Sequence, residues 1–332
     1  MTLGTLYLDK QTELVRCKGG ALVIGPKGAR STSVPLSLLD RVVINGNVQL
    51  STTVVGSIVD SGASLILLTA KHGRRVAIVH GRYHSDASVR IAQYASYRDR
   101  SWRERWARRF VLGKIRGYVA FFRHKLPTRP DRRFVLKRSI DRLVSALATI
   151  QEAQTADALT LDMIRGIEGA AARTAFDALA ALLPPEAGFH GRNRRPPKDP
   201  ANACLSLAYT LIHADAVRAA YAGGLDPYVG YLHDISYGRE SLACDLVEIL
   251  RPEVDRFVCA LFNDQTLRAR DFSRDAGGCF MKKAARQKFY PAFEAFARGP
   301  RRLLRRTVRL IVRHLREREF ANDCGTGQVY LP

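Results

Sequence analysis

The 332-residue sequence predicts an α+β protein, in which a small β-rich N-terminal domain precedes a larger helical domain. Up to about residue 85, short runs rich in Leu, Val and Ile are separated by Gly, Pro, Asn and Asp, a pattern typical of strands and turns. From near Tyr83 to Phe320, apolar residues recur at helical spacing, and Ala, Leu and Arg dominate. We therefore expect domains at 1–85 and 86–332, with the boundary between residues 82 and 90.

The first domain contains several predicted strands and one predicted helix. The helix covers Thr52–Val59, because four apolar side chains fall on one side of it and Gly62 follows its end. The predicted strands are the apolar runs Leu6–Leu8, Ala21–Ile24, Arg41–Ile44, Ser64–Leu68 and Val76–Val79.

The second domain shows helical periodicity on both sides of a proline-rich stretch. Leu159, Met163, Ile164 and Ile167 form one such pattern, and Leu205, Ala208, Leu211 and Ile212 form another. Between them, 184–200 contains five prolines and a basic patch, and we predict a loop there. Asp199 suits an N-cap and Pro200 a first-turn position, so a helix is expected through 201–221.

The charge of the chain points to a polyanionic partner. The formal net charge is +22, from 53 Lys and Arg against 31 Asp and Glu. Self-repulsion at this level disfavours a compact fold unless a polyanion is bound, so nucleic acid comes first and an anionic membrane surface second. Arg favours phosphate recognition, since its guanidinium bonds two phosphate oxygens at once. The bland alternative is a merely basic, soluble protein.

Two tracts carry much of this charge. Residues 90–138 hold 16 Lys and Arg against 3 Asp and Glu, and residues 298–319 hold 9 Arg against 2 Glu. We expect the arginine faces to bind phosphate backbones without reading sequence. The aromatic side chains of the first tract are expected to form a buried helix stripe instead of a base-stacking platform; they are Trp102, Trp106, Phe110, Tyr118, Phe121 and Phe122.

The cysteines and the hydropathy pattern indicate a cytosolic protein. The six cysteines form no C-x-x-C pair, which favours small buried hydrophobic residues over a disulfide framework or a zinc site. No basic-then-apolar leader precedes the first domain, and no stretch of about 18 apolar residues is present to span a bilayer.

Three segments bring acidic or imidazole groups into this basic chain. Glu168 lies among glycines and alanines, whose small size allows another helix or a ligand backbone to approach closely. His233 ends the apolar run that begins at Gly230. Taken singly, Glu168 is more typical of a surface carboxylate and His233 of a half-buried core residue.

The third segment is 242–252, in which Asp245 and Glu248 lie three residues apart. A helix places both on one face, where they repel each other unless a cation or a basic group lies between them. Leu242, Leu246 and Ile249 are expected on the opposite, core-facing side. One imidazole with two or three carboxylates suits Mg²⁺ or Mn²⁺ better than structural zinc. Spacing alone does not require the three segments to meet.

Four long motifs, in order, resemble the CRISPR-associated endonuclease of spacer acquisition, the Cas1 family. Arg165–Arg173 is similar to R-G-x-E-G-x-A-A-R, and Gly191–Ser206 to G-R-x-x-R-P-P-x-D-P-x-N-A-x-L-S. Gly224–His233 with Gly238–Pro252 resembles G-L-D-P-x-x-G-x-L-H followed by G-R-x-S-L-A-x-D-L-x-E-x-x-R-P. Val34–Ile44 also resembles the family in the β region. The resemblance spans nearly the whole chain.

This resemblance implies a fold, partners and an activity. The fold would be a small β-sandwich-like dimerisation domain followed by an all-helical catalytic domain. The family forms homodimers, which join the small Cas2 protein in a heterohexamer that carries double-stranded DNA to a CRISPR repeat. The activity would be that of an endonuclease and integrase, in which a 3′-hydroxyl of the spacer fragment attacks a repeat-boundary phosphodiester with the help of Mg²⁺ or Mn²⁺.

The family's ion ligands fall on Glu168, His233 and Glu248, and Asp245 takes a supporting role at the catalytic site. Two departures concern Cys244, where the family usually has Ala or Leu, and Glu248, where some branches have Asp. Candidate DNA contacts are the basic side chains of the first tract and of the matched loops; they are Arg103, Arg105, Arg109, Arg192, Arg194, Arg195, Lys198 and Arg239.

Two other functions fit the same residues. The chain could be a non-catalytic DNA-binding scaffold, although burying this many acids without an ion would be costly. It could also be a general repair nuclease for branched DNA with the same site. The genomic neighbourhood, beside a repeat array or not, would separate the repair nuclease from the integrase.

Overall fold

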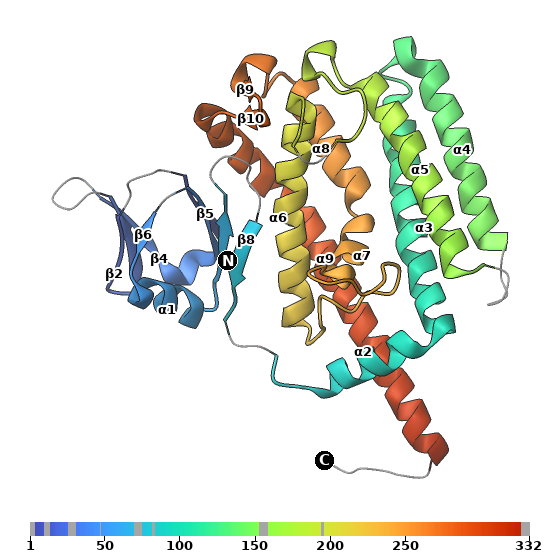
Figure 1. Cartoon of the computed structure of the whole chain (residues 1–332), viewed down its shortest axis with the longest axis horizontal. Coiled ribbons are helices and arrows are strands. Elements are labelled where there is room, and N and C mark those ends of the chain that lie inside the picture. The colour runs from blue at the N-terminus through green and yellow to red at the C-terminus, as the bar shows by residue number, and fades with distance from the viewer. Residues whose placement is uncertain are drawn as a thin grey trace.

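The computed structural model describes residues 4–9, 14–25, 31–46, 48–69, 75–81, 84–152, 159–193 and 196–326, with side chains up to Arg318. A β-rich region and a larger bundle of helices lie side by side, and the helix α9 reaches across the bundle and beyond it (Figure 1). The prediction of an α+β fold is confirmed.

The N-terminal region contains two four-stranded sheets. The first has the order β1-β5-β7-β8, in which β1, β5 and β7 are parallel and β8 is antiparallel to β7. The second has the order β4-β3-β2-β6, with β2, β3 and β4 antiparallel. The strands are β1 Gly4–Leu8, β2 Leu14–Lys18, β3 Ala21–Ile24, β4 Thr32–Pro35, β5 Leu39–Asn45, β6 Gln49–Leu50, β7 Ser64–Leu68 and β8 Arg75–Val79.

Both sheets contribute to one apolar core, together with the helix α1 (Thr52–Asp60). Ser51 caps α1, because its side chain accepts a hydrogen bond from the backbone N–H of Val54 at 3.3 Å. All five predicted strands and the predicted helix are confirmed. Strands β2, β4 and β6 were not predicted, because their apolar patterns are weaker.

The first sheet is covered on both faces, so its central strands bury apolar side chains on both sides. Along β5, Val42 and Ile44 belong to the core between the sheets, whereas Val43 joins the core of the helices. Ile66 and Leu68 of β7 also join the core of the helices. Helices therefore cover the face of this sheet that the second sheet leaves free.

Eight α-helices and one hairpin make up most of the rest of the described chain. They are α2 Ser88–Arg98, α3 Arg100–Lys125, α4 Arg133–Glu152, α5 Leu161–Leu182, α6 Pro200–Ala222, α7 Ser241–Glu248, α8 Arg251–Asn263 and α9 Lys283–Thr326. The hairpin pairs β9 Phe272–Asp275 with β10 Gly278–Met281, so this region is mostly helical and not all-helical as expected. Asp199 and Pro200 begin α6 as predicted, and the Asp199 side chain accepts from the N–H of Asn202 at 2.8 Å.

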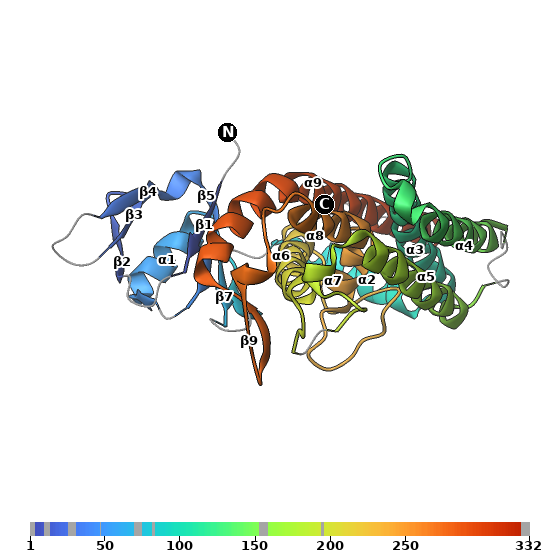
Figure 2. The same ribbon diagram turned by 90° about the horizontal axis from the view of Figure 1, so that it is seen from above.

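The aromatic residues of the first basic tract form the predicted buried stripe. All six are at most 4% exposed. The helices α4 and α5 lie against α3 on one side of the bundle, and α6, α7 and α8 lie in its middle (Figures 1 and 2). None of the helices in the described part of the chain is both long enough and apolar enough to cross a bilayer.

A charged network ties the β region to the helices. Arg41 on β5 is buried against Asp215 on α6, and Arg301 on α9 bonds the other oxygen of Asp215 at 2.8 Å. Arg301 also contacts Glu294 at 2.6 Å, and Glu294 accepts from the hydroxyl of Tyr7 on β1 at 2.6 Å. Each buried charge of this network therefore has an opposite partner.

A candidate metal centre between three helices

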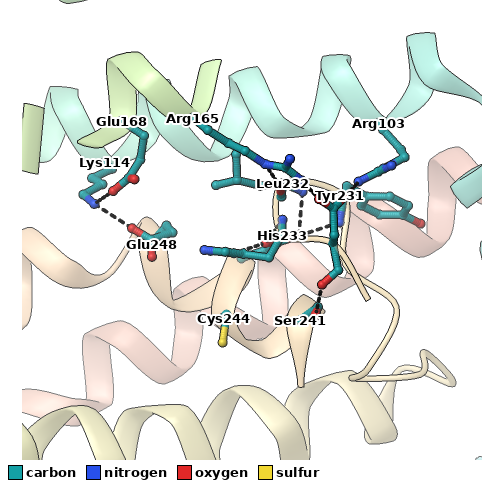
Figure 3. Close-up of polar contacts among 12 residues, drawn as sticks. Arg103, Lys114, Arg165, Glu168, Tyr231, Leu232, His233, Ser241, Cys244 and Glu248 are labelled. Atoms are coloured by element: carbon teal, nitrogen blue, oxygen red, sulfur yellow. Dashed lines mark hydrogen bonds and ion pairs between the residues drawn. The ribbon is translucent and has the colours of Figure 1, made fainter. Parts of the chain in front are cut away.

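A buried lysine joins two carboxylates that the sequence places 80 residues apart. Glu168 comes from the middle of α5, Glu248 is the last residue of α7, and Lys114 lies in the middle of α3. The Lys114 ammonium donates to Oε2 of Glu248 at 2.7 Å and forms an ion pair with Oε1 of Glu168. The two acids thus converge on one cationic group, as Figure 3 shows.

Two glycines of α3 make this convergence possible. A Cβ atom at Gly113 would lie 2.9 Å from a side-chain carbon of Ile249, and one at Gly117 would lie 2.8 Å from the ring of Pro252. The turn between α7 and α8 therefore lies directly against the backbone of α3. Because Lys114 follows Gly113, this close packing brings its side chain to Glu248.

Glu248 is the more deeply buried of the two acids. Its side chain is 3% exposed, whereas that of Glu168 is 23% exposed. Burial would raise the pKa of Glu248, but Arg251, whose Nε lies 2.8 Å from Oε1, and Lys114 together hold this pKa well below its usual range. Glu248 is therefore ionised at neutral pH.

Arg251 is held in place by a second buried group. Its guanidinium lies 5.1 Å from the ring centre of Tyr209, whose hydroxyl donates to Asp255. Tyr118 on α3 donates to the other oxygen of Asp255 at 2.6 Å. Burial raises the pKa of Asp255, while both tyrosine hydroxyls and Arg251 oppose that rise.

Asp245 holds the segment that carries His233. Its Oδ2 accepts from the backbone N–H groups of Tyr231 at 2.6 Å and of Leu232 at 3.0 Å. Its Oδ1 accepts from the N–H of His233 at 3.0 Å and lies 2.6 Å from Nδ1 of the same residue. A carboxylate at Nδ1 leaves Nε2 free to bind an ion, which is the usual arrangement for a metal-binding histidine.

Gly230 permits this packing, since a Cβ there would lie 2.9 Å from Oδ2 of Asp245. Asp245 and Glu248 lie on one face of α7 as expected, but that face is as deeply buried as the face that carries the leucines. Asp245, Glu248, Leu242 and Leu246 are all at most 2% exposed, so α7 is buried on both sides. Each acid has its own basic or N–H partners, and the two do not depend on a common cation.

The three predicted ligands gather in one region, but they do not yet form a closed site. Among the residues that the structure describes, no three His, Cys, Asp or Glu side chains lie close enough to hold an ion as they stand. The His233 ring points toward Glu248 in Figure 3, and the Lys114 ammonium occupies the side of Glu248 that faces Glu168. The donor set nevertheless fits a divalent ion, because both carboxylates already bind a cation and His233 retains a free nitrogen.

Two arginines that the sequence analysis did not assign to this region fasten the histidine segment to the helices. Arg165 on α5 donates to the carbonyl of Leu232 at 2.8 Å and pairs with Asp234 at 2.7 Å. Arg103 on α3 pairs with the other oxygen of Asp234 and stacks 4.5 Å from the ring centre of Tyr97. Arg103, predicted as a DNA contact, is therefore engaged within the protein.

The other candidate DNA contacts divide into exposed and engaged side chains. Arg192 bonds Oδ1 of Asn202 at 2.7 Å and Oγ of Ser206 at 3.2 Å, so it holds the loop against α6. Arg194 and Arg195 lie outside the described residues. The exposed candidates are Arg105, Arg109, Lys198 and Arg239.

The second basic tract forms a row of arginines along α9. Leu304, Val308 and Ile311 face the core, and the arginines lie on the opposite side of the helix at helical spacing. Figure 2 shows α9 on the far side of the bundle from α7. The exposed arginines of this tract are Arg298, Arg302, Arg305, Arg306, Arg309, Arg313 and Arg316.

Glu168 is the candidate ligand that solvent reaches. Its side chain is 23% exposed, so part of the carboxylate is accessible to a ligand. Fold and site together define a strongly basic α+β protein with a carboxylate–histidine centre in its helical region.

Comparison with known proteins specifies that class further. The family model described as CRISPR associated protein Cas1 matches residues 6–295. A CRISPR-associated endonuclease Cas1 of Thermodesulfovibrio yellowstonii is 36% identical over 95% of this chain and 98% of its own length. A CRISPR-associated endonuclease Cas1 of Thermus thermophilus is 36% identical over 88% of this chain and 84% of its own length. The chain therefore belongs to the Cas1 family.

Solved structures share the fold. A Cas1 protein from Thermotoga maritima superposes with a TM-score of 0.79 at 22% identity, over 94% of this chain and 97% of its own. A casposase bound to its integration product gives a TM-score of 0.77 at 19% identity, over 95% of this chain and 91% of its own. The arrangement of the β region and the helices is thus that of Cas1 proteins.

Proposed function

We propose that this protein is a metal-dependent DNA endonuclease and integrase that inserts spacer DNA into a CRISPR array. The observation that carries the proposal is the convergence of Glu168 and Glu248 on one cationic group, beside a histidine whose Nδ1 is held by Asp245. Two relatives that are 36% identical are called CRISPR-associated endonucleases, which supports action on nucleic acid.

In this proposal, Glu168, Glu248 and Nε2 of His233 hold one Mg²⁺ or Mn²⁺ ion. When bound, the ion supplies positive charge that stabilises the phosphodiester during attack and favours ionisation of the attacking 3′-hydroxyl. Asp245 fixes the ring of His233 so that its free nitrogen faces the acids, and Arg251 keeps Glu248 ionised and oriented. In the reaction, one P–O bond forms to the 3′-oxygen and one P–O bond to the leaving strand breaks.

The substrate reaches the site at the exposed part of Glu168, whose side chain is 23% exposed. The exposed side chains of Arg105 and Arg109 lie on neighbouring α3. These arginines contact phosphates and contribute affinity without sequence preference.

The proposed partners are double-stranded DNA, a second copy of the chain and the small Cas2 protein, in a heterohexamer. One structural relative, with a TM-score of 0.79, is part of a Cas6-RT-Cas1–Cas2 complex and another is a casposase bound to an integration product. These likenesses support DNA and Cas2 as partners for a protein with this fold.

A joining assay tests the proposal. The parent, Glu168→Ala and Glu168→Gln are each mixed with a labelled duplex fragment, a supercoiled plasmid that bears a CRISPR repeat, the Cas2 partner and Mn²⁺ or Mg²⁺. We expect the parent to join the fragment and both variants to lose joining by orders of magnitude, because one ion ligand is removed. A gel shift on the same samples should show unchanged or slightly tighter DNA binding. A variant that joins as well as the parent, or a parent that binds DNA without joining it in either ion, would favour a DNA-binding scaffold.

A further inference from the structure

The side chain of Lys114 is buried at the centre of the proposed ion site. Lys114 is 1% exposed, and a lysine so far from solvent requires opposite charges around its ammonium group. Glu168 and Glu248 supply them from two other helices. The protein therefore neutralises these two acids with its own lysine.

The lysine is fixed in this position by the scaffold. It lies between Gly113 and Gly117, the two positions at which α3 contacts the turn between α7 and α8. A surface lysine would choose among many conformations, whereas the backbone of this one is held where its ammonium meets both partners. The oxygens that it contacts, Oε1 of Glu168 and Oε2 of Glu248, belong to the carboxylates that the proposed function assigns to the ion.

We propose that Lys114 is an internal counter-cation that occupies the two carboxylates in the metal-free protein and competes with the divalent ion for them. The inference rests on the proposed ion site. Its consequence is that Lys114 weakens ion binding while it stabilises the metal-free fold, because an ammonium and a divalent ion cannot both occupy the space between these two oxygens. Arg251 remains with the other oxygen of Glu248 in both states.

This role differs from that of an ordinary structural ion pair. If Lys114 only held the helices together, its removal would disorder the acids and weaken ion binding. If Lys114 competes with the ion, its removal leaves the two acids with one cation fewer, so the ion binds more tightly. The direction of the change in ion affinity therefore separates the two roles.

The test measures the Mn²⁺ affinity and the melting temperature of the full chain in the parent and in Lys114→Met. Lys137→Met is the matched control, since Lys137 is exposed on α4 and its loss changes the net charge equally. We expect Lys114→Met to melt at a lower temperature without ion, to bind Mn²⁺ at least about tenfold more tightly and to gain more stability from it. Lys137→Met should behave as the parent does.

Lys114→Gln, which removes the charge but keeps a hydrogen-bond donor, guards against a variant that fails to fold. Folding of either variant that requires Mn²⁺ supports the proposal, and failure of both to fold at saturating Mn²⁺ contradicts it. Unchanged or weaker Mn²⁺ binding by Lys114→Met also overturns it. A parent whose Mn²⁺ binding is lost in Glu168→Ala, together with a Lys114→Met variant of unchanged affinity, would refute the counter-cation alone. A parent that binds no Mn²⁺ would refute the proposed ion site and the competition with it.

Discussion

Replacing Asp245 with Asn tests whether this buried carboxylate holds the histidine segment. In the parent, each of its oxygens accepts two hydrogen bonds, from three backbone N–H groups and from the ring of His233. An asparagine keeps one oxygen and presents an N–H₂ group where the other stood. The N–H₂ group of the asparagine then faces two of these four hydrogen-bond donors, at a position that is 0% exposed.

The structure sets the size of the effect. Two charge-assisted hydrogen bonds are lost, each worth about 1.5–3 kcal/mol, so Asp245→Asn should lower the free energy of unfolding by about 4 kcal/mol. For a chain of this length, about 0.7 kcal/mol of stability corresponds to 1 °C, which predicts a melting temperature lower by about 6 °C. Differential scanning calorimetry of the metal-free protein measures this shift.

The matched control is Asp177→Asn, which removes the same charge from an exposed position on α5. It should melt within about 1 °C of the parent, as is usual for surface substitutions. If Asp245→Asn also melts within 1 °C of the parent, the four hydrogen bonds do not hold this segment, and the reasoning about His233 fails with them.

Three further predictions concern pH, the charged network and DNA. Burial, aided by Arg75 and Arg251, lowers the pKa of His213 to about 4. The unfolded chain therefore takes up this proton at a higher pH than the folded chain does, and the free energy of unfolding should fall by about 3 kcal/mol between pH 6.5 and 4. His213→Gln should make the melting temperature depend less on pH, and an unchanged dependence would contradict this prediction. Arg301→Gln leaves Glu294 without its arginine and should cost about 3 kcal/mol in urea unfolding, whereas a loss below 0.5 kcal/mol would show that the network is dispensable. Arg105→Glu with Arg109→Glu should weaken binding to all duplexes alike and reduce the slope of log affinity against log salt by about 2, and an unaltered slope would show a solvated face.

Much of the fold follows from the sequence because its signals are local. Runs rich in Leu, Val and Ile predicted β5 and β7, and Asp199 with Pro200 predicted the start of α6. The hairpin β9–β10 was missed, since its strands are four residues long and interrupt a chain of helical patterns. Only the Gly-Gly pair at residues 277–278 marks its turn.

The site was predictable in its acids but not in its cations. Family motifs single out Glu168, His233 and Glu248, whereas Lys114 stands in a tract of 16 basic residues whose charged face was expected to bind phosphates. Its burial depends on how α3 packs against the turn after α7, which no local pattern encodes. Arg103 shows the reverse error, because Asp234 lies 131 residues away along the chain and pairs with it.

The central claim is that Glu168, His233 and Glu248 hold one divalent ion, and a crystal soaked in Mn²⁺ tests it most directly. The anomalous difference map should show one peak about 2.0–2.6 Å from a carboxylate oxygen of each acid and from Nε2 of His233. In the soaked crystal, the Lys114 ammonium should no longer contact the oxygens of Glu168 and Glu248. A peak elsewhere would contradict the account. So would a fully soaked crystal in which Lys114 still joins Glu168 and Glu248 and no peak lies beside them.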